Sequence, residues 1–492
     1  NPVDKDALYS LIADDEKLAL LFINTIAAFI TVFRKPRSIA SVFAWMMTLV
    51  FIPGIGFLLY LFCGRGIDGE IIYKFSEHHQ SRINELNQII KVHNYSFPEH
   101  PYSDDNHLLE RYFKNLDESP LTKGNKVEFY TDGKEKFAAL FEDMKQAEDN
   151  LHVEYYSFFN DEIGGQFLSI LIDKAREGVE VRLVYDPWGS PKANRKFFQP
   201  LIDAGGKVVP FITSKNLIRN TRLNYHLHRK IVVIDGQIGW TGGFNVGDQY
   251  LGKKAKFGYW RDTHARIVGT ASFTLQEIFI RDWNASVKRE EDQLEYEDRY
   301  FILPPKERSG NVDLQIVADG PESETQILKG GFVKMILAAK ESIWIQTPYL
   351  IPDDSMMNAL EIAIHSGVDV RIMIPCMPDH PFIYRATQHY ANYLHRRGAK
   401  IYIYNNGFLH AKTVMMDDTI SSFGTTNQDI RSYALNFEVN AFAYDHDVTQ
   451  TLKGFFEEDM AQSTLLTDEI LAKQSYWLRF KQNFSRLLSP IL

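Results

Sequence analysis

Apolar and polar positions divide the chain into an apolar amino-terminal part and a longer part in which short apolar runs alternate with polar stretches. Two long apolar runs come first, at residues 18–33 and 39–63, with a basic stretch between them. Each run approaches or exceeds the roughly 20 residues that a helix needs to cross a bilayer. The pattern therefore predicts that residues 1–66 contain membrane segments.

The second apolar run carries Pro53 and Gly54 near its middle, where a straight helix would lose a backbone hydrogen bond. Because basic residues flank this run on both sides, the positive-inside rule favours a re-entrant or interfacial hairpin with both ends in the cytoplasm. A plain second span stays open. A cleaved signal peptide is the alternative for the first run, but Asp14, Asp15 and Glu16 carry the wrong charge for its leading region.

The rest of the chain begins with a charged connector, residues 67–125, and then shows one order of elements twice. The matching strand-like runs lie at residues 151–156, 178–184 and 204–209 in one copy, and at residues 343–348, 367–373 and 397–402 in the other. Amphipathic helical stretches separate these runs, which is typical of α/β domains with parallel or mixed sheets. The long offset between the copies indicates domain duplication. We therefore predict two similar α/β halves, residues 126–305 and 306–492.

The composition narrows the class of protein. A chain of 492 residues with 45% hydrophobic residues is long enough for two domains and too apolar for a disordered protein. Its two cysteines, Cys63 and Cys376, lie far apart, which argues against a disulfide framework and favours a reducing, cytosol-facing environment. The formal net charge of -9 gives no general attraction to nucleic acid. No cluster of cysteine and histidine has zinc-site spacing.

The same chemical motif, H-x-K-x-x-x-x-D, occurs once in each copy: His228, Lys230 and Asp235 in the first, and His410, Lys412 and Asp417 in the second. A single motif of three fixed residues is weak evidence, because it arises easily by chance. Here the agreement continues, since Asn245 follows His228 by the same spacing with which Asn427 follows His410. Two copies in register indicate one duplicated site.

The motif residues divide by their expected position on a strand. Histidine and lysine two residues apart point to the same face, so we expect them to form the chemical face. The aspartates, Asp235 and Asp417, fall at turns after the apolar run. We therefore expect these two members of the catalytic motif to organise the local structure.

These residue types supply what an exchange of phosphodiesters needs. One imidazole attacks phosphorus and forms a phosphohistidine, while the other protonates the leaving oxygen and later deprotonates the incoming alcohol. Lys230 and Lys412, with the amides of Asn245 and Asn427, would bind the phosphate and stabilise charge on its nonbridging oxygens. This chemistry requires no metal and no cofactor.

The paired motifs resemble those of the phospholipase D superfamily, and the sequence around them is similar to its bacterial cardiolipin synthase branch. The similar segments are residues 240–248 (WTGGFNVGD), 259–264 (YWRDTH), 347–349 (TPY) and 427–438 (NQDIRSYALNFE). The similarity covers almost the whole chain, including the two apolar runs. It implies two phospholipase D-like half-domains that share one active site, preceded by N-terminal membrane segments.

The resemblance also implies an activity: a phosphatidyltransferase of the bacterial cell membrane, with its catalytic halves in the cytoplasm, that converts two molecules of phosphatidylglycerol into cardiolipin and glycerol. In the superfamily a carboxylate after each motif orients the catalytic imidazole, and Asp262 and Glu438 match those places. Which histidine attacks stays open, although superfamily analogy favours His228. The expected partners are phosphatidylglycerol and other anionic membrane lipids, with no nucleic acid.

Two residues near the motifs have alternative interpretations. His226 either lines the site or packs at the edge of its strand, and edge packing is the favoured interpretation. Arg431 either contacts a lipid phosphate or pairs with a carboxylate.

Three other functions compete with the leading one. A phospholipase D-type hydrolase, or a transferase that uses another headgroup donor, would share the same motifs. A phosphodiesterase acting on nucleic acid fits the membrane segments and the acidic balance poorly. A membrane scaffold with a degenerate fold would have lost a motif histidine or lysine, and all four are present. The sequence leaves the oligomeric state open.

Overall fold

The computed structural model describes residues 39–52, 80–98, 104–117, 119–212, 225–323 and 325–487, with a few isolated positions before residue 61. The chain divides into two compact units. One comprises residues 1–72 and 214–225, and the other comprises residues 73–213 and 226–492. The second unit contains both copies of the repeat.

Within the first unit, helix α2 (Ile39–Phe51) covers part of the second predicted membrane segment. Leu49 and Tyr60 are buried, with Trp45 packed against them. Among the described residues, no helix combines the length and the apolar character needed to cross a bilayer. The first predicted segment, residues 18–33, and the proline–glycine bend of the second lie outside the described residues apart from isolated positions, so the membrane topology stays a prediction.

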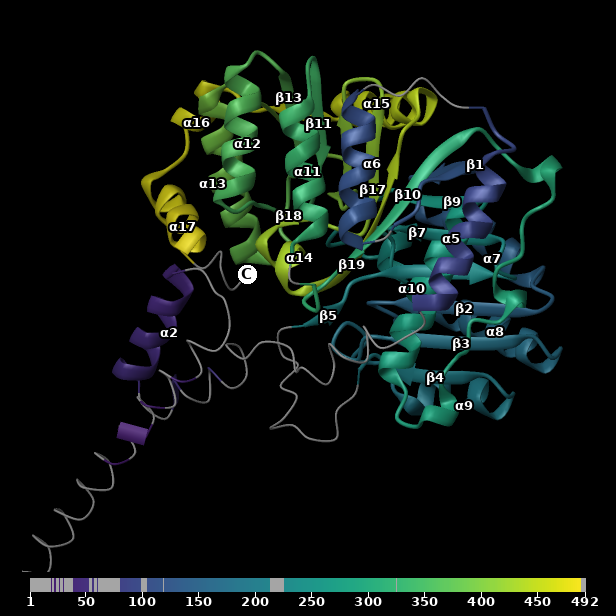
Figure 1. Cartoon of the computed structure of the whole chain (residues 1–492). Coiled ribbons are helices and arrows are strands. Elements are labelled where there is room, and N and C mark those ends of the chain that lie inside the picture. Colours follow the sequence, from purple (N-terminus) through teal and green to yellow (C-terminus); the bar gives the residue numbers. More distant parts are fainter. Residues whose placement is uncertain are drawn as a thin grey trace, which may run out of the picture. The chain divides into compact units, whose positions relative to one another are not determined.

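The second unit is built on one continuous sheet in which the two halves repeat the same strand order (Figure 1). The first half contributes, in spatial order, β1 (Thr122–Tyr130), β9 (His264–Val268), β7 (Ile238–Gly242), β6 (Lys230–Ile234), β2 (Asn150–Tyr155), β3 (Glu180–Tyr185) and β4 (Lys207–Pro210). The second half contributes β10 (Val312–Asp319), β19 (Asn436–Ala443), β17 (Ile420–Gly424), β16 (Thr413–Met416), β11 (Ser342–Gln346), β13 (Asp369–Pro375), β14 (Lys400–Tyr404) and β20 (Ser463–Leu465).

The pairing of the strands confirms the prediction of two similar mixed α/β halves. In each half, three strands pair in parallel, β2–β3–β4 and β11–β13–β14, and the motif strand pairs antiparallel to the first of them, β6 to β2 and β16 to β11. The halves join where β1 pairs antiparallel with β10, with Thr122 opposite Leu314. The whole sheet therefore continues from one half into the other.

Helices cover the sheet in both halves. The first half carries α7 (Gly133–Lys145), α8 (Glu162–Arg176), α9 (Arg195–Asp203) and α10 (Ala271–Ser286). The second carries α11 (Ile327–Ala338), α12 (Asp354–His365), α13 (Pro381–Arg397), α14 (Ile430–Ala434), α15 (His446–Met460), α16 (Asp468–Ala472) and α17 (Tyr476–Leu487). Side chains fix several starts, since Asp132, Asp161 and Asp445 accept hydrogen bonds from the first-turn amides of α7, α8 and α15.

One hydrophobic cluster is shared by the two halves and fixes them against each other. It combines Leu275 of α10 with Phe456 of α15, both buried, and with residues of the central strands from both halves. Across the joint, the rings of Phe129 and Phe423 meet edge to face at 4.8 Å between centroids. The two halves therefore share a single core.

The stretch predicted as a polar connector contains two helices, α5 (Gln80–Asn94) and α6 (Asp104–Asp117). Leu109 and Phe113 of α6 are buried in the core of the second half, and the ring of Phe113 lies 4.4 Å from that of Phe442. Their spacing of four residues puts them on one helix face, a short apolar stripe that the polar composition of the segment obscured.

Candidate active site

Two short strand pairs bring the motifs together at the junction of the halves. In the first, β5 (His226–Leu227) pairs in parallel with the start of β19 in the other half, and the amide of His228 donates to the carbonyl of Phe437 at 2.9 Å. In the second, β15 (Phe408–Leu409) pairs in parallel with β8 (Trp260–Arg261), and the amide of His410 donates to the carbonyl of Arg261 at 2.7 Å. Each motif histidine is therefore held by the main chain of the opposite half.

This arrangement corrects the prediction that the histidine and lysine of each motif lie on one strand. In the second half, β15 ends at Leu409 and β16 begins only at Thr413. The first half shows the same break. The chain leaves β5 at Leu227 and enters β6 only at Lys230. The break arises because β5 pairs with β19 of the second half, whereas β6 pairs with β2 and β7 of its own half. His228 lies in the short link between β5, which pairs with the second half, and β6, which pairs within the first half.

The carboxylates also come from the opposite halves. Nδ1 of His228 lies 2.8 Å from Oε1 of Glu438, and Nδ1 of His410 lies 2.6 Å from Oδ2 of Asp262. Thr425 donates to Glu438 at 2.5 Å, and the amide of Thr263 donates to Asp262 at 2.8 Å. Since an ionised carboxylate only accepts, each imidazole donates from Nδ1 and keeps the lone pair of Nε2.

Burial keeps both imidazoles neutral in the resting site. It lowers the pKa of His228 to about 4, and the negative charge of Glu438 only partly opposes this shift. Burial also lowers the pKa of His410, with the charge of Lys412 adding to the effect. Burial alone would raise the pKa of Glu438 and Asp262, but the histidine partners and nearby lysines outweigh it, so the pKa of each carboxyl is lowered.

The two motif lysines lie behind the histidines. Nζ of Lys230 donates to the carbonyl of His228 at 2.5 Å, and Nζ of Lys412 donates to the carbonyl of His410 at 2.6 Å. Burial lowers the pKa of Lys230 to about 7 and that of Lys412 to about 8. An anionic phosphate nearby would raise both values and favour the charged ammonium.

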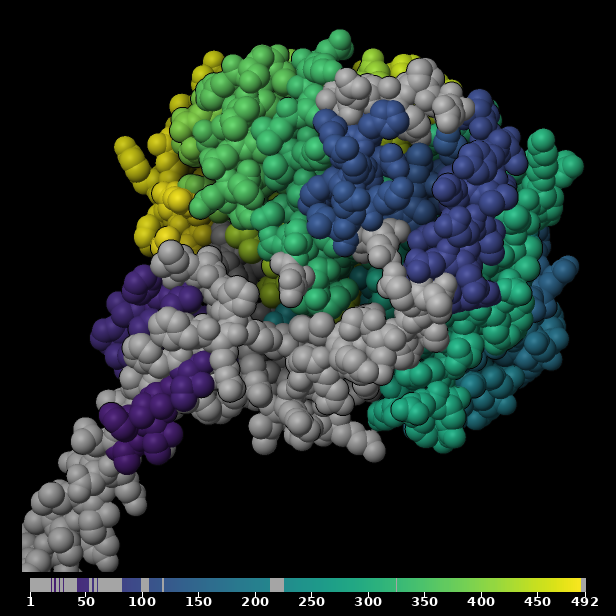
Figure 2. All heavy atoms as spheres, in the orientation of Figure 1, coloured from purple at the N-terminus to yellow at the C-terminus, as the bar shows by residue number. Residues whose placement is uncertain are grey.

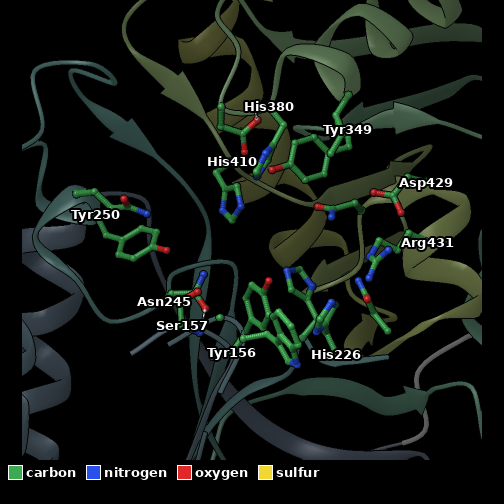
Figure 3. A pocket seen from close by; sticks show the side chains of 18 of the residues that line it. Tyr156, Ser157, His226, Asn245, Tyr250, Tyr349, His380, His410, Asp429 and Arg431 are labelled. Atoms are coloured by element: carbon green, nitrogen blue, oxygen red, sulfur yellow. Dashed lines mark hydrogen bonds between the residues drawn. The ribbon is translucent and has the colours of Figure 1, made fainter. Parts of the chain in front are cut away.

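A single cavity of about 380 Å³ contains both histidines and both predicted asparagines in its lining. Figure 3 shows His410 and Tyr156 entering this pocket from opposite sides, with Asn245 beside them. The main-chain amide of Ser157 donates to Oδ1 of Asn245 at 3.1 Å. This contact does not use the NH₂ group of Asn245. The pocket thus combines the histidine and amide groups predicted from the sequence.

The motif aspartates lie at turns and bind main-chain amides. Oδ1 of Asp235 accepts from the amides of Asp149 and Asn150 at 2.8 and 2.9 Å. Asp417 repeats this arrangement, since its Oδ1 accepts from the amides of Glu341 and Ser342 at 2.8 and 2.9 Å. Both aspartates have a left-handed backbone, with φ of 51° and 48°. Their contacts are those of residues that fix the start of β2 and of β11.

His226 and Arg431, for which the sequence allowed two interpretations each, both line the pocket. His226 lines the pocket, and its Nδ1 lies 3.7 Å from Oδ2 of Asp186, so the preference for simple edge packing was wrong. Arg431 lines the same pocket near Asp429, whose pKa burial raises to about 6.

Other lining residues escaped the sequence analysis. Tyr156 directly follows β2, Tyr349 comes three residues after β11, and both line the pocket. The hydroxyl of Tyr349 donates to the carboxylate of Asp379. Their position just beyond the carboxyl ends of two matching strands was the available signal, because that edge of an α/β sheet holds ligands. Asp379 comes from a loop before α13 that carries no such signal.

Among the described residues, no group of three or more His, Cys, Asp or Glu side chains is arranged to hold a metal ion.

Comparison with known proteins places these features in a family. The family described as "Cardiolipin synthase, PLD-like domain" matches residues 140–283 and 332–460, one range in each half. The family described as "Phospholipase_D-nuclease N-terminal" matches residues 23–65, which span most of the two apolar runs.

Individual relatives extend over nearly the whole chain. A cardiolipin synthase of Listeria innocua is 46% identical over 479 residues, which cover 96% of this chain and 98% of the relative. One from Staphylococcus aureus strain Mu50 is 45% identical, with 96% of each chain covered. Among solved structures, a phosphatidylserine synthase of Haemophilus influenzae Rd KW20 matches with a TM-score of 0.59 over 78% of this chain and 100% of its own, and at 16% identity this likeness concerns the fold. With both motif pairs inside the matched ranges, the chain belongs to the bacterial cardiolipin synthases of the phospholipase D superfamily.

Proposed function

We propose that the protein transfers a phosphatidyl group from one phosphatidylglycerol to the terminal hydroxyl of a second, releasing cardiolipin and glycerol. The observation that carries this proposal is the presence of two imidazoles in one pocket, each oriented by a carboxylate of the opposite half. Two oriented imidazoles supply a nucleophile and an acid–base partner within one cavity. The curated relatives of matching length carry the name of this activity.

In the first step, Nε2 of His228 attacks phosphorus and the bond from phosphorus to the glycerol oxygen breaks. His410 gives its proton to that oxygen, so glycerol leaves as a neutral alcohol. The phosphatidyl group then remains on His228 through a phosphorus–nitrogen bond. The choice of His228 as the nucleophile follows superfamily analogy, and its lowered pKa supports it because a neutral imidazole carries the attacking lone pair.

In the second step, the neutral His410 removes the proton from the terminal hydroxyl of the second phosphatidylglycerol. The resulting oxygen nucleophile attacks phosphorus, and the phosphorus–nitrogen bond breaks. Cardiolipin forms and both histidines return to their starting state. The same histidine protonates the leaving alcohol and deprotonates the entering one. The complete reaction therefore neither consumes nor releases a proton.

Protonation of His410 before the first step is a consequence of substrate binding. The empty site holds neutral imidazoles, and the negative charge of a bound phosphodiester raises the pKa of a neighbouring imidazole. Asn245 and Asn427 line the pocket, and the ammonium groups of Lys230 and Lys412 lie next to the main chain of the two histidines. Together these groups would stabilise the charge on the nonbridging oxygens.

The proposed location is the bacterial cell membrane, with the amino-terminal segments embedded and the catalytic halves on the cytoplasmic side. The match of residues 23–65 to an N-terminal family of this superfamily supports an anchoring role for both apolar runs. The substrates reside in the same membrane, so anchoring raises their local concentration at the pocket.

A reaction with a single lipid tests the proposed function. The purified full chain is incubated with phosphatidylglycerol alone in detergent, and the products are measured by mass spectrometry. We expect cardiolipin and glycerol in equal amounts. Phosphatidic acid as the main product would identify a hydrolase instead, and cardiolipin that forms only after phosphatidylethanolamine is added would identify a different donor.

A further inference from the structure

The last helix of the described chain, α17, exposes its apolar face to solvent. Its large apolar side chains repeat at helical spacing and are exposed by 47% to 91%: Tyr476, Trp477, Phe480, Phe484 and Leu487. Figure 2 shows this helix, in yellow, at the surface of the second half. Contiguous exposed apolar faces of this kind mark interaction sites.

The inner face of α17 is polar, which reverses the usual pattern of a surface helix. Gln482 and Ser485 are buried, and Asn392 of α13 donates to Gln482 at 3.3 Å and to Gln474, just before α17, at 3.2 Å. The helix is therefore fixed to α13 through amide contacts. Its aromatic face is not used by the core of the protein and is therefore available to a partner.

The aromatic side chains of this face pack against one another. The rings of Trp477 and Phe480 stack at 5.3 Å with 9° between their planes, and those of Phe480 and Phe484 follow at 6.3 Å and 20°. A stacked ladder has few rotamers to lose, which reduces the entropic cost of binding. Aromatic side chains of this kind favour the interface between water and a bilayer.

The charges on α17 indicate which kind of surface its aromatic face would contact. The helix carries Arg479, Lys481 and Arg486 and no acidic residue, in a chain whose formal net charge is -9. By the helical period, Lys481 lies on one side of the aromatic face and the two arginines lie on the other. An apolar face bordered by cations is complementary to a bilayer that carries anionic headgroups.

The direction of α17 relates this face to the active site. Gln474 contacts Asn392, whereas Gln482 also reaches back to Gln388, so the carboxyl end of α17 points toward the beginning of α13. The loop and first turn at that end contribute His380 and Ile383 to the pocket lining. Figure 1 shows α17 lying beside α13. The carboxyl end of the aromatic face therefore lies near the end of α13 that contributes to the pocket.

We infer that α17 is an interfacial helix that docks the catalytic halves on a bilayer surface bearing anionic lipid headgroups. This role is separate from the chemistry of the histidines and does not depend on which lipid donates the phosphatidyl group. It adds a second membrane contact at the opposite end of the chain from the apolar runs.

A fluorescent label tests the inference directly. In a chain with Cys63→Ser and Cys376→Ser that keeps its turnover, a single cysteine replaces either Phe480 or, as control, the similarly exposed Ile362 of α12. Each is labelled with an environment-sensitive dye and reconstituted into vesicles of phosphatidylglycerol and phosphatidylcholine. We expect a blue-shifted emission and quenching by shallow nitroxide lipids at position 480 and not at 362. Equal emission and quenching at the two positions would overturn the inference.

Turnover provides an independent test that also separates this inference from the proposed function. In the variant Trp477→Ser, Phe480→Ser, Phe484→Ser we expect turnover on phosphatidylglycerol vesicles to fall by about fivefold or more, with detergent turnover unchanged. The milder variant Lys481→Gln, Arg486→Gln should fold normally and lose the dependence of vesicle turnover on the anionic lipid fraction. The control Ile362→Ser should match the unmodified chain.

Three results would contradict the docking role. Unchanged vesicle turnover in both variants would show that the face does not contact lipid. An equal loss in detergent and on vesicles would assign the face to the catalytic site. A shift from oligomer to monomer with unchanged vesicle turnover would show that a second copy of the chain covers the face.

Discussion

Glu438 in the second half accepts a hydrogen bond from Nδ1 of His228 in the first half, at 2.8 Å. Asp262 of the first half does the same for His410 of the second, at 2.6 Å. Neither half therefore contains a complete histidine–carboxylate pair. Each pair exists only where the two halves meet.

The crossed carboxylates should be essential to turnover. In Glu438→Gln or Asp262→Asn, the amide no longer forces its histidine to donate from Nδ1, so the imidazole loses its orientation and its reactive tautomer. We expect each variant to lose about two orders of magnitude or more in kcat, with folding retained. The measurement is kcat on detergent-dispersed phosphatidylglycerol, at equal folded protein.

A buried carboxylate outside the pocket supplies the control. Asp143 pairs with Arg266 and accepts from Trp240, so Asp143→Asn should reduce stability while kcat stays near normal. If Glu438→Gln and Asp262→Asn behave like Asp143→Asn, the carboxylates are structural and do not orient the histidines.

The pH profile of kcat/KM should be bell-shaped, because this ratio reports groups of the free enzyme. Burial places the pKa of Lys230 at about 7 and that of Lys412 at about 8, so their positive charge is lost as the pH rises through this range. Weaker attraction for phosphate then lowers kcat/KM. On the acid side, protonation of His228 near pH 4 removes its lone pair and lowers kcat/KM again.

Replacement of one lysine checks the assignment of the alkaline limb. The guanidinium of Lys230→Arg stays charged at all these pH values, so the lower of the two lysine pKa values no longer contributes and the limb should move from about pH 7 toward pH 8, even if the absolute rate falls. An alkaline limb at the same pH in this variant would mean that Lys230 does not set it.

The motif aspartates should matter for stability more than for chemistry. Asp235→Ala and Asp417→Ala each remove an acceptor from several main-chain amides, and we expect a loss of about 1–3 kcal/mol in the free energy of unfolding. Asn at either position keeps one acceptor oxygen and tolerates the left-handed backbone, so it should restore most of the stability. Denaturant unfolding and kcat per folded molecule are measured together. An alanine variant with normal stability and no turnover would give the aspartate a direct catalytic role.

The local pattern of the sequence was sufficient to predict the repeat. Buried runs such as β2 and β11 are short, apolar and followed by helices, so their order identified two α/β halves. The motif spacing identified both histidines. These features depend on neighbours in the chain, which is why the sequence alone reveals them.

The contacts between the halves could not be predicted in this way. The pairing of His228 with Glu438 and the insertion of Phe113 of α6 into the second core depend on how distant segments pack. The same holds for Asp379, which reaches the pocket through its contact with Tyr349. No periodicity in the sequence encodes such partners.

The amino-terminal segments should serve access to lipid. Residues 1–72, together with residues 214–225, form a compact unit distinct from the unit that holds both copies of the repeat, so removal of residues 1–65 should leave the halves folded. Turnover on bilayers should fall sharply while activity on detergent-dispersed lipid is largely kept. Circular dichroism and both assays are compared at equal folded protein. Equal bilayer turnover with and without the segments would show that they are dispensable, and loss of folding would show that they are structurally integrated.

The most direct test of the shared site is covalent trapping of the phosphatidyl group. His228→Ala and His410→Ala should each abolish turnover, because nucleophile and acid–base partner come from different halves. With ³²P-labelled phosphatidyl-p-nitrophenol, whose leaving group departs without a proton from His410, rapid quenching under conditions that preserve phosphohistidine should reveal label on His228 in the His410→Ala chain and no label in the His228→Ala chain. Label on His410 in the His228→Ala chain, or near-normal turnover in either variant, would contradict this account.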